Sequence, residues 1–181
     1  MTRCRILTVT ALAVIGIAAA SAIDWPTKLL WNATASAPIG FYTIEPANAL
    51  DVPELVAAVP PEPLAAFMVE RGYVAPGVPL LKRVLGLRGQ RVCRAGRTIT
   101  VDGVEMGEAL ERDRIGRDLP VWQGCRAIAP GEIFLMNWDI RDSLDGRYFG
   151  PIPASSVIGR AVPLWTDPEG DGRYEWRAPT H

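Results

Sequence analysis

Histidine is nearly absent from this sequence: the single one, His181, is the last of 181 residues. Because chain ends fray, His181 is a poor general base, which argues against a Ser-His-Asp triad. The same shortage excludes zinc sites built from several histidines. We therefore expect no metal and no cofactor, and an activated serine would need a carboxylate or a lysine as its base.

An excess of charge of either sign is also missing, because 19 basic and 20 acidic residues give a net charge of −1. Nucleic-acid binding normally needs a basic patch, so no nucleic-acid partner is expected. The length predicts one domain. The 16 prolines and 17 glycines favour many turns and short strands over a helix bundle. The predicted fold class is therefore mainly β, with a short helix.

The N-terminal segment holds a long run without charge. Arg3 and Arg5 precede it, and residues 6–23 contain no charged side chain. At 1.5 Å per residue the run spans about 27 Å, near the thickness of a bilayer core. This predicts a transmembrane helix with its N-terminus in the cytoplasm. The alternative is a cleaved signal peptide, since residues 18–22 are small, but the run exceeds the usual apolar region of about 7–15 residues.

The predicted organisation has four parts. They are a cytoplasmic N-terminus (1–5), a transmembrane anchor (6–23), an exported domain (24–165) and a polar C-terminal tail (166–181). Cys93 and Cys125 fall in the exported domain, where a disulfide can form. The sequence leaves open whether these two cysteines are bonded or are two buried free thiols.

Within the exported domain, most of the local patterns indicate strands. Residues 63–71 are the exception: they predict a short helix, with proline in its first turn and Gly72 at its end. The Asp102-Gly103 pair indicates a hairpin turn. Residues 108–118 are charged and predict an exposed loop. The predicted strands cover residues 40–45, 78–84, 91–93, 98–101, 131–137 and 156–165.

Ser36 and Lys82 are the candidate reactive pair. Ser36 lies between alanines, just beyond the apolar run, which is a poor environment for a core residue and an ordinary one for a turn. Lys82 lies in the apolar segment 78–84, where burial can lower the pKa of a lysine far enough for it to act as a base. Strand alternation would place Lys82 inward and Arg83 outward. The alternative for Lys82 is an exposed edge strand, where lysine commonly prevents aggregation.

Three blocks of sequence, in order, carry a family resemblance. They are TASAPIGFY at 34–42, LKRVLGLRG at 81–89 and NWDIRDSLDGRYFG at 137–150, followed by Gly-Arg-Ala at 159–161. The sequence resembles the type I signal peptidases of the serine–lysine class. It looks most like the TraF-type pilin peptidases of conjugative transfer, because the first block has Ser-x-Pro and then Gly-x-Tyr. The resemblance implies a signal-peptidase-like β-fold behind one N-terminal transmembrane helix.

The resemblance also implies roles for individual residues. Ser36 matches the nucleophile and Lys82 the general base. Thr34 matches a hydroxyl that helps to form the oxyanion hole with the backbone N–H of Ser36, where aimed donors lower the barrier by a few kcal/mol.

The third block supplies supporting residues. Ser143 matches a serine that orients the lysine, and Asp145 and Arg147 match an ion pair that braces the site. On one strand Asp145 and Arg147 would share a face. The alternative for Ser143 is a serine in a polar turn, and the alternative for Asp145 and Arg147 is a solvated surface ion pair that adds little to stability. The segment 136–139 departs from the family pattern, because it reads Met-Asn-Trp-Asp where Gly-Asp-Asn is common.

The implied function is removal of a leader peptide from an exported preprotein, and most specifically from a conjugative prepilin. The implied cleavage site follows small residues. The implied location is the inner membrane, single-pass, with the catalytic domain in the periplasm. The implied partners are the lipid bilayer and components of conjugation or type IV secretion. Capture of the acyl-enzyme by an amine, which would cyclise a pilin, is a further outcome in this branch. The alternatives are a housekeeping signal peptidase and a non-catalytic, membrane-tethered scaffold on the same fold.

Overall fold

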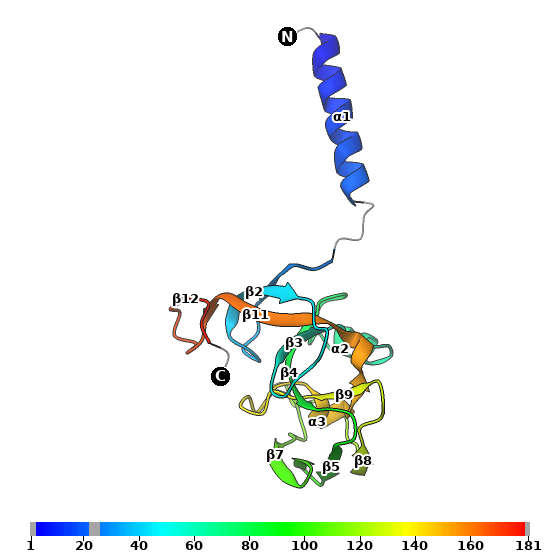
Figure 1. Ribbon diagram of the computed structural model, residues 1–181, viewed down its shortest axis with the longest axis vertical. Coiled ribbons are helices and arrows are strands. Elements are labelled where there is room, and N and C mark those ends of the chain that lie inside the picture. Colours follow the sequence, from blue (N-terminus) through cyan, green and yellow to red (C-terminus); the bar gives the residue numbers. More distant parts are fainter. Residues whose placement is uncertain (1–2, 22–25, 180–181) are drawn as a thin grey trace.

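The structure is a computed structural model that describes residues 3–21 and 26–179. It begins with helix α1 (Arg3–Ser21), which extends away from the rest of the chain (Figure 1). The apolar side chains of α1 are exposed, among them Ile6, Leu12 and Ile17. Across the described ranges, no helix combines the length and hydropathy that a membrane crossing requires. The transmembrane prediction for residues 6–23 is therefore not confirmed, and residues 22 and 23 lie outside the described residues.

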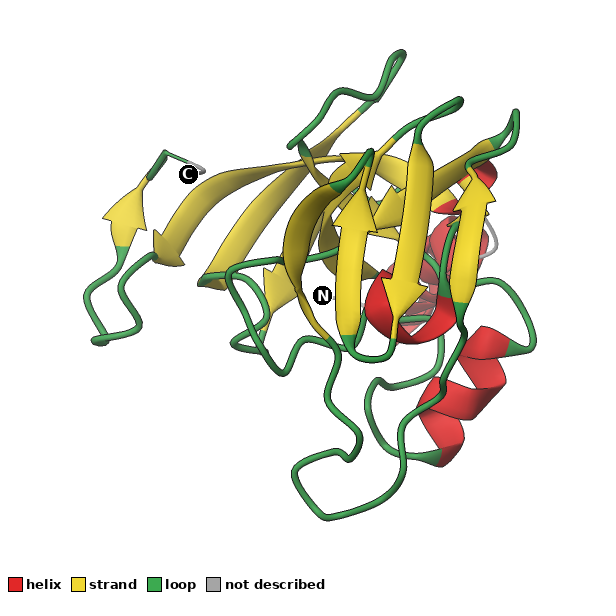
Figure 2. Cartoon of the chain, turned by 90° about the horizontal axis from the view of Figure 1, so that it is seen from below, coloured by secondary structure: helices red, strands yellow, loops and turns green. Residues whose placement is uncertain are grey.

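Strands outnumber helices in the described part of the domain that follows, and the short helices lie beside them (Figure 2). Over the described residues, the larger sheet has eight strands in the order β1-β2-β11-β3-β4-β9-β10, with β12 paired to β11. Its pairings are antiparallel. The bounds are Leu29–Asn32 (β1), Ile39–Glu45 (β2), Leu55–Ala58 (β3), Leu80–Gly86 (β4), Glu132–Leu135 (β9), Ile152–Pro153 (β10), Val157–Asp167 (β11) and Glu175–Trp176 (β12).

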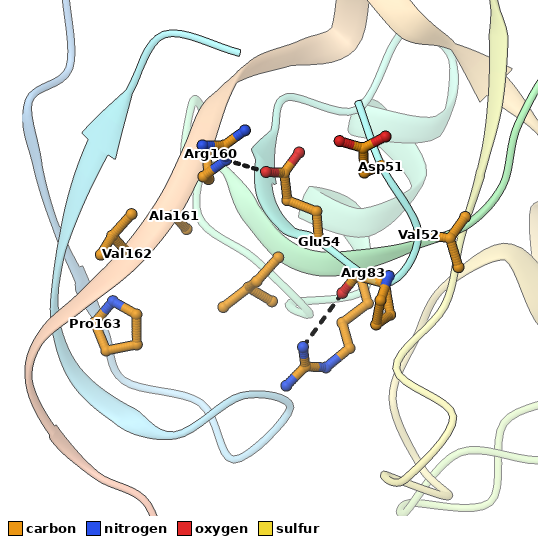
Figure 3. Close-up of a pocket in the computed structure, with 10 residues that line it drawn as sticks. Asp51, Val52, Glu54, Arg83, Arg160, Ala161, Val162 and Pro163 are labelled. Atoms are coloured by element: carbon orange, nitrogen blue, oxygen red, sulfur yellow. Dashed lines mark hydrogen bonds and ion pairs between the residues drawn. The ribbon is translucent and has the colours of Figure 1, made fainter. Parts of the chain in front are cut away.

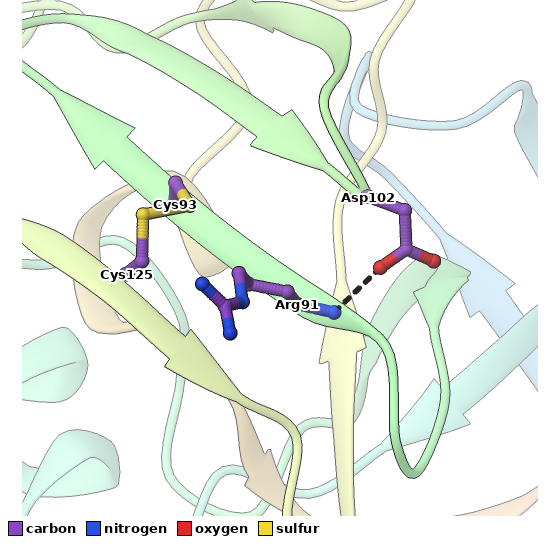
Figure 4. Close-up of a disulfide and its surroundings, with 4 residues drawn as sticks. All are labelled: Arg91, Cys93, Asp102 and Cys125. Carbon is purple, nitrogen blue, oxygen red and sulfur yellow. Dashed lines mark hydrogen bonds between the residues drawn. A yellow bond between two sulfur atoms is a disulfide. The ribbon is translucent and has the colours of Figure 1, made fainter.

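The smaller sheet has four strands in the order β7-β6-β5-β8. They are Arg91–Ala95 (β5), Thr98–Val101 (β6), Val104–Glu108 (β7) and Gly124–Ala127 (β8). The turn between β6 and β7 is the predicted hairpin, and both Asp102 and Gly103 have the positive φ that such a turn needs. Cys93 and Cys125 face each other across β5 and β8 and form a disulfide (Figure 4). The sequence left open whether Cys93 and Cys125 are bonded or free, and in the structure they are bonded.

Apolar side chains cover both faces of the larger sheet. One cluster includes Tyr42, Leu55 and Leu81, and a second includes Val56 and Val84 from the other face of the same strands. Strand β4 is buried along most of its length, since six of its seven residues are buried. A strand in the centre of such a sheet has no face toward solvent, so both Lys82 and Arg83 are buried.

Three helical segments complete the part of the domain that the structure describes. They are α2 (Leu64–Glu70), α3 (Gly146–Phe149) and the 3-10 turn η1 (Ala154–Ser156). The predicted helix at 63–71 is confirmed as α2, which follows Pro63. Part of the segment predicted as a polar C-terminal tail (166–181) belongs to the larger sheet. Strand β11 continues to Asp167, and β12 pairs with it through Trp165 and Trp176.

Candidate active site

Ser36 lies in the loop between β1 and β2, and one buried amide organises this loop. The side-chain N–H₂ group of Asn32, the last residue of β1, donates to the carbonyl oxygens of Thr34 (2.8 Å), Ala37 (2.9 Å) and Pro38 (3.1 Å). Only the nitrogen of an amide side chain can donate, so these bonds fix its orientation. Asn32 therefore folds the chain around Ser36 into one defined turn.

The other end of the Asn32 amide sets the direction of the hydroxyl protons. Asn32 Oδ1 accepts from the Thr34 N–H (3.2 Å) and from Thr34 Oγ1 (3.0 Å), and Thr34 Oγ1 lies 3.1 Å from Ser36 Oγ. A hydroxyl has one proton to donate, so the Thr34 proton points to Asn32 and Ser36 donates to Thr34. For Thr34 to help an oxyanion, its proton has to turn away from Asn32.

Replacing Asn32 with alanine is expected to destabilise the fold by about 1–3 kcal/mol, because three carbonyls lose their buried donor. Urea unfolding measures this loss. Asn48→Ala is the matched control, since Asn48 is exposed and its side chain makes no hydrogen bond within the described structure. Equal behaviour of the two variants would contradict this role of Asn32.

Lys82 lies on β4 and is 3% exposed. Its Nζ donates a 2.7 Å hydrogen bond to Oγ of Ser143, which is also buried. Burial lowers the pKa of Lys82 to about 8; the charge of Arg147 acts in the same direction, while Asp145 and Asp142 oppose it. A substantial fraction of Lys82 is therefore neutral under mildly alkaline conditions, as a general base must be.

Asn137 joins the Ser36 loop to the Lys82 strand, and the sequence reasoning missed it. Its Nδ2 donates to the carbonyl oxygens of Ser36 and Leu81, and its Oδ1 accepts from the N–H of Arg83 at 2.9 Å. One amide thus holds the Ser36 backbone and both residues that flank Lys82. Across the described residues, Ser36 Oγ and Lys82 Nζ share no hydrogen bond, and Asn137 connects the backbone of Ser36 to the backbone on either side of Lys82. Asn137 ends a predicted apolar strand and lies in the segment that departs from the family pattern, but neither feature identifies the contacts of its amide.

Asp145 and Arg147 form a buried ion pair, with 0% and 1% of their side chains exposed. The contact is bidentate: Arg147 Nε donates to Asp145 Oδ1 at 2.9 Å, and Nη2 donates to Oδ2 at 2.7 Å. The prediction that both lie on one strand is wrong. Asp145 is the N-cap of α3 and accepts from the backbone N–H of Arg147, so a helix start brings the two side chains together.

The Asp145–Arg147 pair also holds the loop that carries Asn137 and Ser143. Arg147 donates to the carbonyl oxygens of Asn137 (2.9 Å), Ile140 (2.7 Å) and Arg141 (3.2 Å). Asp145 Oδ2 accepts from the N–H of Asn137 at 3.1 Å. Burial alone would lower the pKa of Arg147, but its bonds to Asp145 raise it above the usual value. The guanidinium stays charged and braces the loop from inside the protein.

Known proteins resemble this chain over most of its length. The family model for signal peptidases, peptidase S26, matches residues 1–165. A conjugal transfer protein TraF of Agrobacterium fabrum is 38% identical over 147 residues, which cover 75% of this chain and 81% of the relative. A plasmid transfer protein TraF of Escherichia coli is 31% identical over 145 residues, covering 75% of this chain and 81% of the relative.

Two further matches bear the name signal peptidase I. One, from Leptolyngbya laminosa, is 34% identical over 83 residues, covering 45% of this chain and 38% of the relative. The other is a crystal structure from Enterococcus faecalis V583, 22% identical, with a TM-score of 0.36, covering 62% of this chain and 98% of that chain. The family model and the transfer proteins cover more of this chain than either of these.

Proposed function

Because the chain belongs to the signal peptidase family, peptidase S26, we propose that it is a serine endopeptidase that removes the leader peptide from an exported precursor, most specifically a conjugative prepilin. The observation that carries this proposal is the environment of Lys82. Its buried amine donates a hydrogen bond to Ser143, and Asn137 ties the neighbouring residues of the Lys82 strand to Ser36. A serine that has no histidine as its base needs another base nearby, and a weakly basic amine can fill that role.

In the proposed reaction, neutral Lys82 accepts the proton of Ser36 Oγ as that oxygen attacks the scissile carbonyl. The tetrahedral intermediate collapses, the C–N bond breaks, and Lys82 returns the proton to the leaving amine. The ester left on Ser36 is then cleaved by water, or by an amine that forms a new peptide bond. The backbone N–H of Ser36 and the Thr34 hydroxyl are the proposed oxyanion donors. Ser143 keeps the lysine aimed by its hydrogen bond.

We also propose that the enzyme works at a membrane surface, outside the reducing cytoplasm. The exposed apolar side chains of α1 support lipid contact. A second exposed group, Trp31, Trp165 and Trp176, lies on β1, β11 and β12, and amphipathic rings of this kind favour membrane interfaces. The disulfide between Cys93 and Cys125 supports an oxidising compartment.

The test is co-expression of the chain with two precursors, a conjugative prepilin and a secreted preprotein with small residues before its cleavage site. We expect cleavage of the prepilin, with a product mass that separates hydrolysis from cyclisation by one water. Preferential cleavage of the secreted preprotein would favour a general signal peptidase, the function named for the Leptolyngbya laminosa relative. Cleavage of neither precursor would contradict the proposal.

The pH dependence of cleavage should follow the pKa of Lys82. Since the neutral amine is the active form and the pKa is about 8, log kcat/KM should rise with unit slope below that pH and level off above it. Activity at pH 6 should then be about one hundredth of the plateau. Steady-state kinetics across pH 5.5–10 would measure the profile. A plateau that already begins at about pH 6, or a rise that continues to about pH 10.5, would contradict a lysine base lowered by burial.

A further inference from the structure

A pocket of about 410 Å³ is lined in part by Arg83, which follows Lys82 in the chain and which the reaction above does not use. Its lining comes from residues 51–55, which reach the start of β3, and from β4 and β11, and Figure 3 shows the side chains around it. Four of the lining residues are charged, and the others are mostly apolar. The charged residues are Asp51, Glu54, Arg83 and Arg160.

Two of these four charges neutralise each other. Arg160 on β11 forms an ion pair with Glu54, and this pair occupies one side of the pocket in Figure 3. Asp51 is exposed, so solvent screens its charge. Arg83 therefore remains as the buried charge without a carboxylate partner among the described residues.

Arg83 is 8% exposed, although strand alternation predicted that it would point to solvent. That prediction is wrong because β4 is covered on both faces. The Arg83 guanidinium makes one hydrogen bond within the described structure, from Nη1 to the carbonyl oxygen of Pro53 at 3.3 Å, and it lies 5.2 Å from the centre of the Trp138 ring. Burial lowers its pKa, and the charge of Asp139 opposes that shift only through space. Most of the Arg83 donors are thus free to bind an anionic group that enters the pocket.

The position of Arg83 connects the pocket to the reacting groups. It follows Lys82 directly, and its backbone N–H is held by the same Asn137 side chain that holds the carbonyl of Ser36. Its guanidinium also interacts electrostatically with Tyr42, whose hydroxyl donates to the Pro38 carbonyl in the Ser36 loop at 2.7 Å. Asn137 and Tyr42 therefore link Arg83 to the Ser36 loop.

We propose that the pocket around Arg83 is a specificity site for a carboxylate of the polypeptide that the enzyme cleaves. The planar guanidinium can bind a carboxylate through two parallel N–H···O bonds. Apolar wall residues, including Leu55, Ala161 and Pro163, would exclude water from that contact. The carboxylate belongs either to an acidic side chain near the cleavage site of that polypeptide or to the C-terminus of that polypeptide. The identity of the ligand as a peptide rests on the proposed function.

The test measures binding without cleavage. The full-length Ser36→Ala chain, in detergent micelles, is titrated with three probes: acetyl-Ala-Ala-Asp-Ala-Ala-amide, the same peptide with asparagine, and acetyl-penta-alanine with a free C-terminus. The readout is the NMR signal of the arginine Nε–Hε groups, with the Arg83 signal assigned from Arg83→Lys. We expect a saturable shift of that signal, with at least about tenfold tighter binding of a carboxylate peptide than of the asparagine peptide.

Each arm of the titration has a defined meaning. Tight binding of the aspartate peptide identifies a side-chain carboxylate, and tight binding of the free-acid peptide identifies a C-terminus. Arg83→Gln should weaken that binding at least about tenfold, whereas the matched surface variant Arg126→Gln should not. Equal affinity for the aspartate, free-acid and asparagine peptides would overturn the proposal, and this comparison needs no variant at Arg83. Because cleavage is not measured, failure here is distinct from failure of the peptidase assay.

Discussion

Replacement of Lys82 with methionine is expected to lower kcat for precursor cleavage by about 10³-fold or more at any pH, with little change in stability. Methionine fills a similar volume and needs no desolvation, so the buried site can accept it. In the proposed reaction, Lys82 is both the base that takes the Ser36 proton and the acid that protonates the leaving amine, and the variant lacks both. Loss of both roles in one substitution is what makes the expected effect so large.

The chain offers a matched control for this prediction. Lys28 is the only other lysine in the sequence, and it is exposed, so Lys28→Met changes composition and charge in the same way without touching the site. Kinetics with the prepilin substrate and a circular dichroism melt should be recorded for both variants. Activity of Lys82→Met within about tenfold of Lys28→Met would exclude Lys82 as the base.

Replacement of Arg147 with methionine is expected to lower the free energy of unfolding by about 3–5 kcal/mol. The substitution leaves Asp145 buried without its cation and removes the donor to three carbonyls of the loop that carries Asn137 and Ser143. Arg112→Met is the matched control, because Arg112 forms an ion pair with Asp118 while 68% of its side chain is exposed. Exposed pairs of this kind contribute about 0–1 kcal/mol. Urea unfolding of the two variants measures the difference.

A double variant separates the cost of the unpaired charge from the value of the bracing. Asp145→Asn combined with Arg147→Met removes both charges, so it should unfold with a smaller loss than Arg147→Met alone. Its cleavage activity should stay low, because the carbonyls of residues 137, 140 and 141 still lack their donor. A loss below about 1 kcal/mol for Arg147→Met would contradict the bracing role.

Much of the fold could be predicted from sequence where local chemistry decides the structure. Residues 98–101 form a strand and residues 102 and 103 its turn, because β-branched residues and an Asp-Gly pair act locally. Helix α2 was predictable from Pro63 and Gly72 for the same reason. The burial of Arg83 was not, since it depends on residues distant in sequence, among them Tyr42 and Ala161, that pack with Leu81 on that face of β4. The start of β12 likewise depends on pairing with a residue of β11.

The site shows the same division. The block around Ser36 and the block around Lys82 could be recognised from short segments of the chain. Asn32 and Asn137 could not, because their amides act on backbone carbonyls, which every residue type presents alike. No side-chain pattern in a single sequence reports such a contact. The Asp145–Arg147 pair was predicted, but its geometry was not, since the cap of a four-residue helix determines it.

The most direct test of the account is to find the atom that carries the acyl group during the reaction. The wild-type chain is mixed with excess prepilin, quenched with acid within milliseconds, digested and analysed by mass spectrometry. The account predicts an acyl adduct on the peptide that contains Ser36, absent from Ser36→Ala, together with loss of cleavage in that variant. An adduct on another residue, or undiminished cleavage by Ser36→Ala, would contradict the central claim that Ser36 is the nucleophile.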